Sequence, residues 1–181
     1  LGPEHLNEDL VKKSKHIFLT SLVSEKNFSL FLKLVKLAKR NHKPIVFAPS
    51  ITMLHRWLPQ LSRIHTSFAV SIFNHEEGMY YTGKEKVKEV LRRLPGNVDV
   101  VSKDVDGAYA KESNNFFHIK ALPVKVVDTL GAGDTFSGAF SHYHLSERRS
   151  VAEALGKAVC TASLKLTRHG GRLNSSAKEV A

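Results

Sequence analysis

Cysteine and long apolar runs are both scarce in this sequence. Cys160 is the only cysteine among 181 residues, so the chain cannot form an internal disulfide. The longest apolar stretches are short and interrupted by Lys, Arg or His, so none approaches the length of a membrane span. The first residues also lack the charged-then-apolar order of a signal peptide. We therefore expect a cytoplasmic protein with no membrane partner.

Acidic residues are few relative to basic ones. The chain has 17 Asp and Glu against 27 Lys and Arg, which gives a net charge of +10 and would suit an anionic partner. Between Lys33 and Lys43, however, the basic residues recur every three or four positions opposite apolar residues, as on the solvated face of an amphipathic helix. No nucleic-acid-binding signature accompanies them. We expect no nucleic-acid partner, and solvated helices that at most help to attract a nucleotide.

Two common patterns for metal and phosphate binding are also missing. His142 and His144 are two positions apart, so on a helix they point about 200° from one another, and no other histidine pair has ligand spacing. No Gly-x-x-x-x-Gly-Lys-[Ser/Thr] occurs either. The sequence therefore predicts neither a histidine metal cluster nor a P-loop kinase.

The first half of the chain alternates apolar runs with segments of helical period. With 42% hydrophobic residues, the chain can build one sizeable core, so we expect residues 1–181 to form a single domain. The expected helices are 2–15, 27–41, 54–64 (broken or begun at Pro59) and 84–93. The expected strands are 16–21, 44–48 and 67–73. This alternation is typical of a mainly parallel sheet with helices on both faces.

The pattern changes after Val98. Short apolar segments follow one another there with only brief turns, which favours adjacent and partly antiparallel strands. The expected strands are 98–104, 107–113, 116–121 and 124–127, and the expected closing helices are 132–145 and 150–167. We expect the polar end, 170–181, to wrap the surface.

A glycine-rich turn between the last expected strand and the next helix carries the chemistry. It reads Asp128-Thr129-Leu130-Gly131-Ala132-Gly133-Asp134. Small residues let the backbone approach a ligand, and a helix start directs unpaired N–H groups and a positive dipole end toward an anion. Asp134, in the first turn, would lie beside that anion as a base for a hydroxyl proton. Alternatively, Asp134 only caps the helix and the glycines only form a tight turn.

This segment resembles in full the [Asp/Asn]-[Ser/Thr]-x-Gly-Ala-Gly-Asp signature of the ribokinase, or pfkB, carbohydrate kinase family. Thr135-Phe136 and Gly138 continue the match. The resemblance implies that Asp134 is the catalytic base and that the backbone of Gly131, Ala132 and Gly133 forms the anion hole for the transferring phosphoryl group. It also implies ATP as a cofactor, bound by Ser102, Asp104, Gly107, Thr129, Gly131 and Gly133.

A second segment, Asn74-His75-Glu76-Glu77, resembles the family's Asn-x-x-Glu motif. By that resemblance, Asn74 and Glu77 lie near a magnesium ion and act through its waters. Asn and Glu directly after a strand are also a common helix cap and first turn, so a purely structural role is the alternative.

Two further segments resemble the nucleotide side of the family. Residues 100–108 resemble the strand and turn along the nucleotide, although Asp104 stands where a glycine is usual and would crowd or repel a phosphate. Residues 158–171 resemble the helix and turn that flank the adenine. In several members this turn also flanks a monovalent cation, so the resemblance implies potassium at Asp128.

The resemblance covers only the C-terminal part of a family whose members are usually much longer. It implies the C-terminal portion of a ribokinase-like three-layer α/β sandwich, without the lid and the residues that hold the acceptor. The implied reaction is transfer of a phosphoryl group from ATP to a hydroxymethyl group of a sugar or nucleoside. In longer members the lid often makes a homodimer. We expect this chain alone to be inactive, and the alternative function is a catalytically silent nucleotide-binding or interaction module.

Overall fold

A single six-stranded sheet organises the computed structural model, which describes residues 2–173. The strands are β1 (Ile17–Leu19), β2 (Ile45–Phe47), β3 (Val70–Asn74), β4 (Val98–Lys103), β5 (Gly107–Glu112) and β6 (Asn115–Ile119). They are arranged in the order in which they occur in the chain. The first four strands are parallel, and β5 and β6 pair antiparallel. The expected mainly parallel sheet is confirmed.

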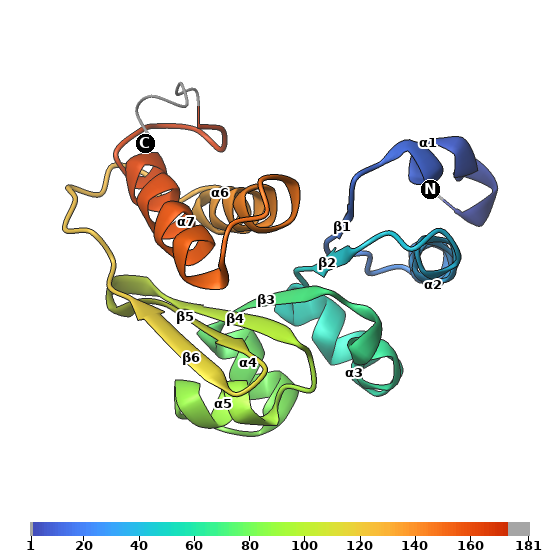
Figure 1. Cartoon of the computed structure of the whole chain (residues 1–181), viewed down its shortest axis with the longest axis horizontal. Coiled ribbons are helices and arrows are strands. Elements are labelled where there is room, and N and C mark those ends of the chain that lie inside the picture. Colours follow the sequence, from blue (N-terminus) through green and yellow to red (C-terminus); the bar gives the residue numbers. More distant parts are fainter. Residues whose placement is uncertain (1, 174–181) are drawn as a thin grey trace.

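Helices cover both faces of this sheet (Figure 1). On one face lie α2 (Glu25–Arg40), α3 (Ile51–Ile64), α4 (His75–Thr82) and α5 (Val87–Arg93), and on the other lie α6 (Ala132–Ser141) and α7 (Val151–Leu166). Successive strand residues point to opposite faces, so Phe73 joins the first core and Ile72 the second. In the inner strands β2 and β3, apolar residues at consecutive positions are therefore all buried, as is usual where a parallel sheet is covered twice.

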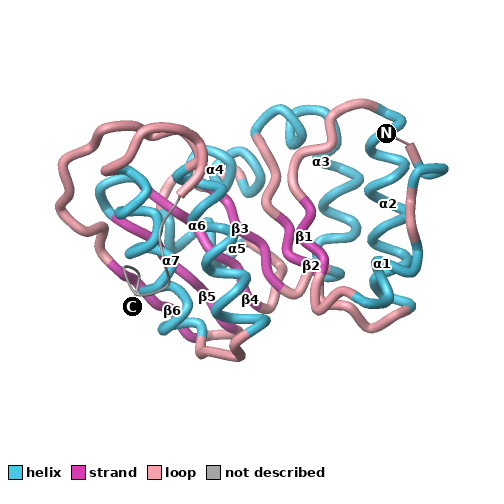
Figure 2. Tube along the Cα trace, turned by 90° about the horizontal axis from the view of Figure 1, so that it is seen from above, coloured by secondary structure: helices cyan, strands magenta, loops and turns pink. Residues whose placement is uncertain are grey.

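The short helix α1 (Glu8–Lys13) lies against α2 at the β1 end of the sheet, as Figure 2 shows from above. A 3₁₀ turn, η1 (Pro3–His5), precedes it, so the single helix expected over 2–15 is in fact two short pieces. At the other end of the sheet, a long loop leads from β6 to α6 (Figure 2). This loop carries the first residues of the glycine-rich turn.

The strand expected over 124–127 is wrong. The side chains of Val126 and Val127 are 55% and 42% exposed. The N–H of Val127 donates to the carbonyl of Leu166 at the end of α7, at 2.7 Å. A short apolar run becomes a strand only where a neighbouring strand takes up its hydrogen bonds, and here the end of a helix takes one instead.

The helix expected to break or begin at Pro59 does neither. It begins at Ile51, where the Ser50 hydroxyl accepts a hydrogen bond from the N–H of Met53, and it continues through Pro59 to Ile64. Pro59 is exposed, so water can reach the carbonyl that loses its donor. Two other helices also differ from expectation. α4 was not expected as an element, and α6 ends at Ser141, where it passes into one π-helical turn, η4 (His142–Ser146).

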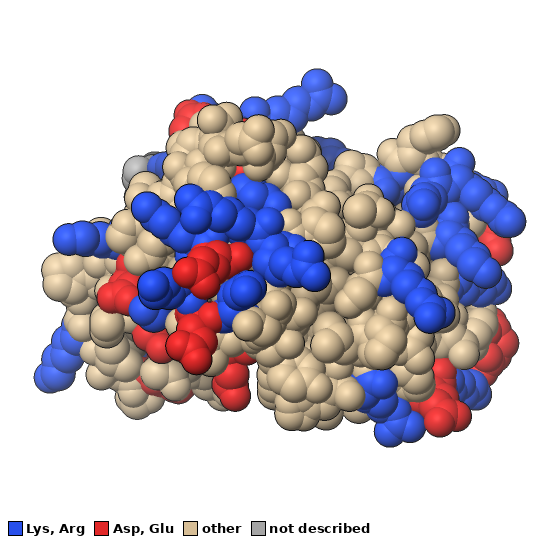
Figure 3. Space-filling model, turned by 90° about the horizontal axis from the view of Figure 1, so that it is seen from below, with Lys and Arg blue, Asp and Glu red and all other residues tan. Residues whose placement is uncertain are grey.

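Charged side chains of both signs are interspersed on the face that α4 and α5 cover (Figure 3). Lys33, Lys36, Lys39, Arg40 and Lys43 belong to α2 and the turn after it. In α2 the buried side chains, such as Phe31 and Val35, point to the core, so the basic residues occupy the solvated side as expected. Within residues 2–173, no helix is both long and apolar enough to cross a membrane.

Candidate active site

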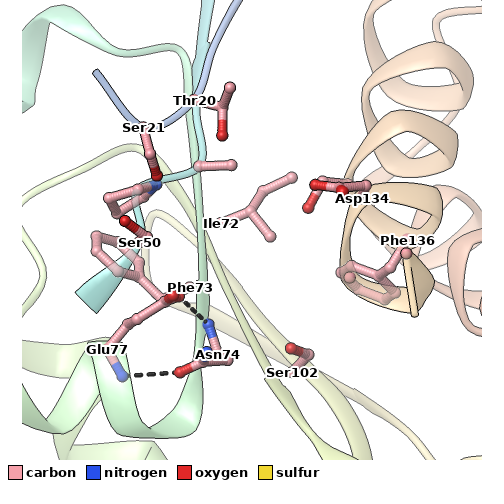
Figure 4. A pocket seen from close by; sticks show the side chains of 15 residues that line it. Thr20, Ser21, Ser50, Ile72, Phe73, Asn74, Glu77, Ser102, Asp134 and Phe136 are labelled. Carbon is pink, nitrogen blue, oxygen red and sulfur yellow. Dashed lines mark hydrogen bonds between the residues drawn. The ribbon is translucent and has the colours of Figure 1, made fainter. Parts of the chain in front are cut away.

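A cavity of about 280 Å³ lies between the ends of the parallel strands and the start of α6. Residues from the loops after β1 and β2 and from the end of β3 form one side, and residues from the start of α6 form the other (Figure 4). Its polar and glycine lining residues are Thr20, Ser21, Ser50, Asn74, Glu77, Ser102, Gly131, Gly133, Asp134 and Ser137. The carboxyl ends of parallel strands are where open α/β sheets usually bind ligands.

The turn into α6 requires glycine at one position, Gly131. Gly131 is the N-cap and has a φ of 76°, in the left-handed region. A Cβ atom there would lie 2.3 Å from the carbonyl oxygen of Gly171. At Gly133, by contrast, an added Cβ would meet nothing within 4 Å. Gly131 therefore sets the path of the turn, whereas Gly133 leaves open space beside the cavity that both residues line.

Two N–H groups of this helix start are available to an anion, whereas that of Ala132 donates to the carbonyl of Thr129, at 3.2 Å. The first intrahelical bond runs from the N–H of Thr135 to the carbonyl of Gly131, at 2.9 Å. The N–H groups of Gly133 and Asp134 come before it, so they have no acceptor within the helix. Both residues line the cavity, where the positive end of the helix dipole adds to the attraction for negative charge.

Asp134 lines the cavity from α6, opposite Thr20 and Ile72 (Figure 4). Its side chain is exposed to solvent. Within residues 2–173, no N–H or side-chain group donates a hydrogen bond to its carboxylate, so it does not act as a cap there. The geometry leaves this carboxylate able to accept a proton from a group bound in the cavity.

Asn74 and Glu77 form a reciprocal cap at the start of α4 and also border the cavity. The Glu77 N–H donates to Oδ1 of Asn74, and the Asn74 N–H donates to Oε2 of Glu77, both at 2.8 Å (Figure 4). Burial raises the pKa of the Glu77 carboxyl to about 7; the Asn74 N–H acts against this shift and the Glu76 charge adds to it. Asn74 and Glu77 therefore cap α4 and line the cavity at the same time.

These residues fit a weakly held divalent ion better than a dedicated metal cage. In the described part of the chain, no group of three or more His, Cys, Asp or Glu side chains could hold a metal ion. Magnesium typically keeps several waters and uses one or two carboxylates together with substrate phosphates. Asn74 and Glu77, which line the same cavity, offer one amide oxygen and one carboxylate for such a set.

The β4–β5 turn is only partly at the cavity. Ser102, at the end of β4, lines it, whereas Asp104, Gly107 and Thr129 are not among the lining residues. Asp104 has a φ of 36° and begins a 3₁₀ turn, η3 (Asp104–Asp106), in a region of backbone conformation that favours glycine. Gly107 has a φ of 88°, and a Cβ there would lie 2.1 Å from the carbonyl oxygen of Ile119.

Asp128 joins the glycine-rich turn to the end of α7. Its carboxylate accepts hydrogen bonds from the N–H groups of Leu130, at 2.9 Å, and Gly170, at 2.8 Å. These two bonds lower the pKa of Asp128. The main-chain oxygens of Asp128 and Arg168 both accept from the ammonium group of Lys165, at 3.3 and 3.2 Å. A potassium ion expected at Asp128 would meet this ammonium group, so the residues do not fit an added cation there.

Sequence reasoning missed the hydroxyl residues on the strand side of the cavity. Thr20, Ser21 and Ser50 line it, and each follows an apolar strand by only one to three residues. Single serines and threonines carry little information in a sequence. Their position after parallel strands is the signal that would have selected them.

The chain resembles known kinases along almost its whole length. A family model described as pfkB family carbohydrate kinase matches residues 1–178. A 5-dehydro-2-deoxygluconokinase of Bacillus licheniformis is 28% identical over 185 residues, which cover 93% of this chain and 56% of the relative. A ribokinase of Dictyostelium discoideum is 45% identical over 87 residues, which cover 48% and 25%. The chain thus spans about half the length of the curated relatives that match it along most of its own length.

Solved structures show the same fold. Adenosine kinase from Sinorhizobium meliloti superposes with a TM-score of 0.88 at 19% identity, covering 100% of this chain and 59% of that one. A putative ribokinase II from E. coli, in complex with ATP and Mg²⁺, gives a TM-score of 0.82 at 25% identity and covers 94% and 58%. The expected ribokinase-like fold is confirmed. Together with the match over residues 1–178, these findings establish that the chain belongs to the pfkB family of carbohydrate kinases.

Proposed function

We propose that this chain is the ATP-binding and catalytic part, folded as one domain, of a kinase that phosphorylates a hydroxymethyl group of a sugar or nucleoside. One observation carries the proposal: Asp134 and Gly133, whose N–H groups have no acceptor within α6, line the same cavity as the Asp134 carboxylate. The relatives named above are kinases of a sugar or nucleoside, which supports this substrate class.

Asp134 has the role of the base. The acceptor hydroxyl oxygen forms a bond to the γ-phosphorus of ATP, the bond from that phosphorus to the β–γ bridging oxygen breaks, and ADP leaves. The hydroxyl proton passes to the Asp134 carboxylate, which no group in the described chain neutralises by hydrogen bonding. Since the carboxylate is exposed in the cavity, it can reach a hydroxyl held there.

The turn 131–133 has the role of the anion hole. Charge on the transferring group is spread over its non-bridging oxygens, and fixed N–H dipoles stabilise it without having to reorient. Gly131 holds the turn in a left-handed conformation, and Ala132 and Gly133 begin the helix. Small residues keep the cavity open to the phosphates at this point.

Asn74 and Glu77 have the role of holding magnesium through water. When bound, magnesium neutralises phosphate charge and so favours transfer. The reciprocal hydrogen bonds between the two residues fix the orientation of the Glu77 carboxylate at the cavity. A nearby divalent cation favours the charged form of a carboxyl whose pKa burial has raised.

The remaining nucleotide contacts are assigned to Ser102, Asp104, Gly107 and Thr129, of which Ser102 lines the cavity. The cytoplasmic location and a homodimer formed through a lid stay predictions from the sequence.

The proposal is tested by phosphoryl transfer from magnesium-ATP over a panel of sugars and nucleosides, using a full-length kinase that contains residues 1–181. We expect ADP release that depends on one class of acceptor, with a phosphate ester as product. ATP binding without an acceptor-dependent product anywhere in the panel would instead support the silent module.

A further inference from the structure

Lys165 is a lysine with no access to solvent. Its side chain is 0% exposed, although it lies in the last turn of α7. A buried ammonium group is unfavourable unless hydrogen-bond acceptors surround it. Here the acceptors include two main-chain oxygens, those of Asp128 and Arg168. The positive charge is thus held between the glycine-rich turn and the turn that follows α7.

The two turns are also joined by direct hydrogen bonds. The carbonyl of Leu166 accepts from the N–H groups of Val127 and Asp128, at 2.7 and 3.2 Å. In return, the Asp128 carboxylate accepts from the N–H of Gly170. Gly131 lies so close to the Gly171 carbonyl that no side chain fits between them. Any shift of the end of α7 therefore moves the backbone of the anion-binding turn.

The surroundings of this ammonium group are those of a monovalent cation site. Main-chain oxygens from two separate turns converge on a single positive charge, and the Asp128 carboxylate belongs to the same network. Carbonyl and carboxylate oxygens are the usual ligands of hard cations. An ammonium ion supplies one positive charge and directs its protons at such oxygens.

We propose that the Lys165 ammonium group is a built-in cation that positions the glycine-rich turn, so that the chain needs no potassium there. Lys165 is a positioning residue, because it acts through the backbone of Asp128 and the turn 129–133. The inference rests on the proposed function only in taking that turn as the phosphate side of the cavity. It attributes the expected independence from potassium to the side chain of Lys165.

A second buried lysine provides a matched control. Lys111 is also nearly inaccessible, and its ammonium group donates to the Leu94 carbonyl at 2.6 Å and pairs with the Asp99 carboxylate at 2.9 Å. It lies in β5, and none of these contacts involves the glycine-rich turn. Lys111→Met therefore removes a buried ammonium group at a position where potassium is not expected to substitute for it.

The test compares melting temperatures of the 181-residue chain in potassium chloride and in choline chloride at equal ionic strength. We expect the same midpoint in both salts for wild type. Lys165→Met should melt lower, and potassium should restore part of the loss where choline restores none. Lys111→Met should melt lower by the same amount in both salts. Lys165→Gln serves as the second variant if the Met variant does not fold.

Binding of magnesium-ADP gives a second readout. Calorimetric titration should give the same dissociation constant for wild type in both salts. Lys165→Met should bind more weakly, and potassium should lower its dissociation constant severalfold. Wild-type stability or affinity that rises specifically with potassium would overturn the inference, as would Lys165 variants that respond equally to potassium and choline. Melting needs no nucleotide, so this result is independent of whether the kinase transfers a phosphoryl group.

Discussion

Asn74 and Glu77 cap the N-terminal end of α4 through two reciprocal hydrogen bonds of 2.8 Å, and both residues line the same cavity as Asp134. Burial makes this pair sensitive to pH, because it raises the pKa of Glu77 from 4.5 to about 7. The folded protein therefore holds the Glu77 proton more tightly than the unfolded chain does. The stability that this confers is complete below pH 4.5 and is lost as pH rises through about 7.

Glu77→Gln should change the pH dependence of stability. Glutamine cannot ionise and still offers an oxygen to the Asn74 N–H, so the melting temperature of the variant should rise relative to wild type between pH 5 and pH 8. Thermal melts at both pH values measure this difference. Glu85→Gln is the control, because it removes an exposed charge that is not among the causes of the Glu77 shift. An equal wild-type-to-variant difference at both pH values would show that Glu77 is not a buried acid in solution.

A buried ion pair between β4 and β5 should contribute strongly to stability. Asp99 is fully buried. Its Oδ2 forms an ion pair with Nζ of Lys111 at 2.9 Å, and its Oδ1 lies 3.2 Å from Nε2 of His65. Asp99→Leu leaves Lys111 buried without its carboxylate, and we expect a loss of about 3–5 kcal/mol in the free energy of unfolding.

Chemical denaturation measures this loss. Asp106→Asn is the control, because it breaks the exposed 2.7 Å pair with Lys103 and should leave stability unchanged. If the two variants lose equal stability, the Asp99 network is not the buried ion pair described here.

Gly131 and Gly133 should respond differently to alanine. Gly131→Ala places a methyl group 2.3 Å from the Gly171 carbonyl oxygen at a φ of 76°, so it should lower stability by about 1–3 kcal/mol and weaken nucleotide binding. Gly133→Ala meets no atom within 4 Å and should keep stability while it narrows the cavity. Melting and magnesium-ADP titration separate the two effects. Equal stability of both variants would contradict the close approach of Gly131 to Gly171.

Much of this architecture could be predicted from the sequence because strong local signals agree with the tertiary structure. The buried strand β2 is an uninterrupted apolar run, most residues of β3 are apolar, and Gly131 occurs at the left-handed position that begins α6. α4 was missed because it has only eight residues and one buried position, Gly78, so it shows little periodicity. The run 124–127 was misassigned because its hydrogen-bond partner, Leu166, is distant in sequence.

The site was predicted only where a motif existed. The residues that do line one cavity are Gly131, Gly133, Asp134, Asn74, Glu77 and Ser102. Lys165 could not be recognised, because a lysine in the last turn of a helix ordinarily interacts with solvent and the helix dipole. Its burial depends on the loop 120–131 folding back against α7, which no local pattern reports.

The isolated 181-residue chain should bind magnesium-ATP weakly and phosphorylate nothing. The cavity contains the groups proposed to meet the phosphates. Holding an acceptor near the γ-phosphate lowers a barrier by about 7–11 kcal/mol. The chain resembles only the part of the family that is expected to lack the residues that hold the acceptor. Exposed Phe18, on the edge strand β1, is an aggregation risk. Calorimetry and an ADP-release assay over sugars and nucleosides measure both properties. Robust turnover on any acceptor would place an acceptor site within residues 1–181.

The most direct test of the account is the turnover of Asp134→Asn in a full-length kinase that contains this chain. Asparagine keeps the shape of the side chain and removes the proton acceptor. We expect turnover to fall by about two to four orders of magnitude, with melting temperature and magnesium-ADP affinity unchanged. Turnover within about threefold of wild type would contradict the assignment of Asp134 as the base.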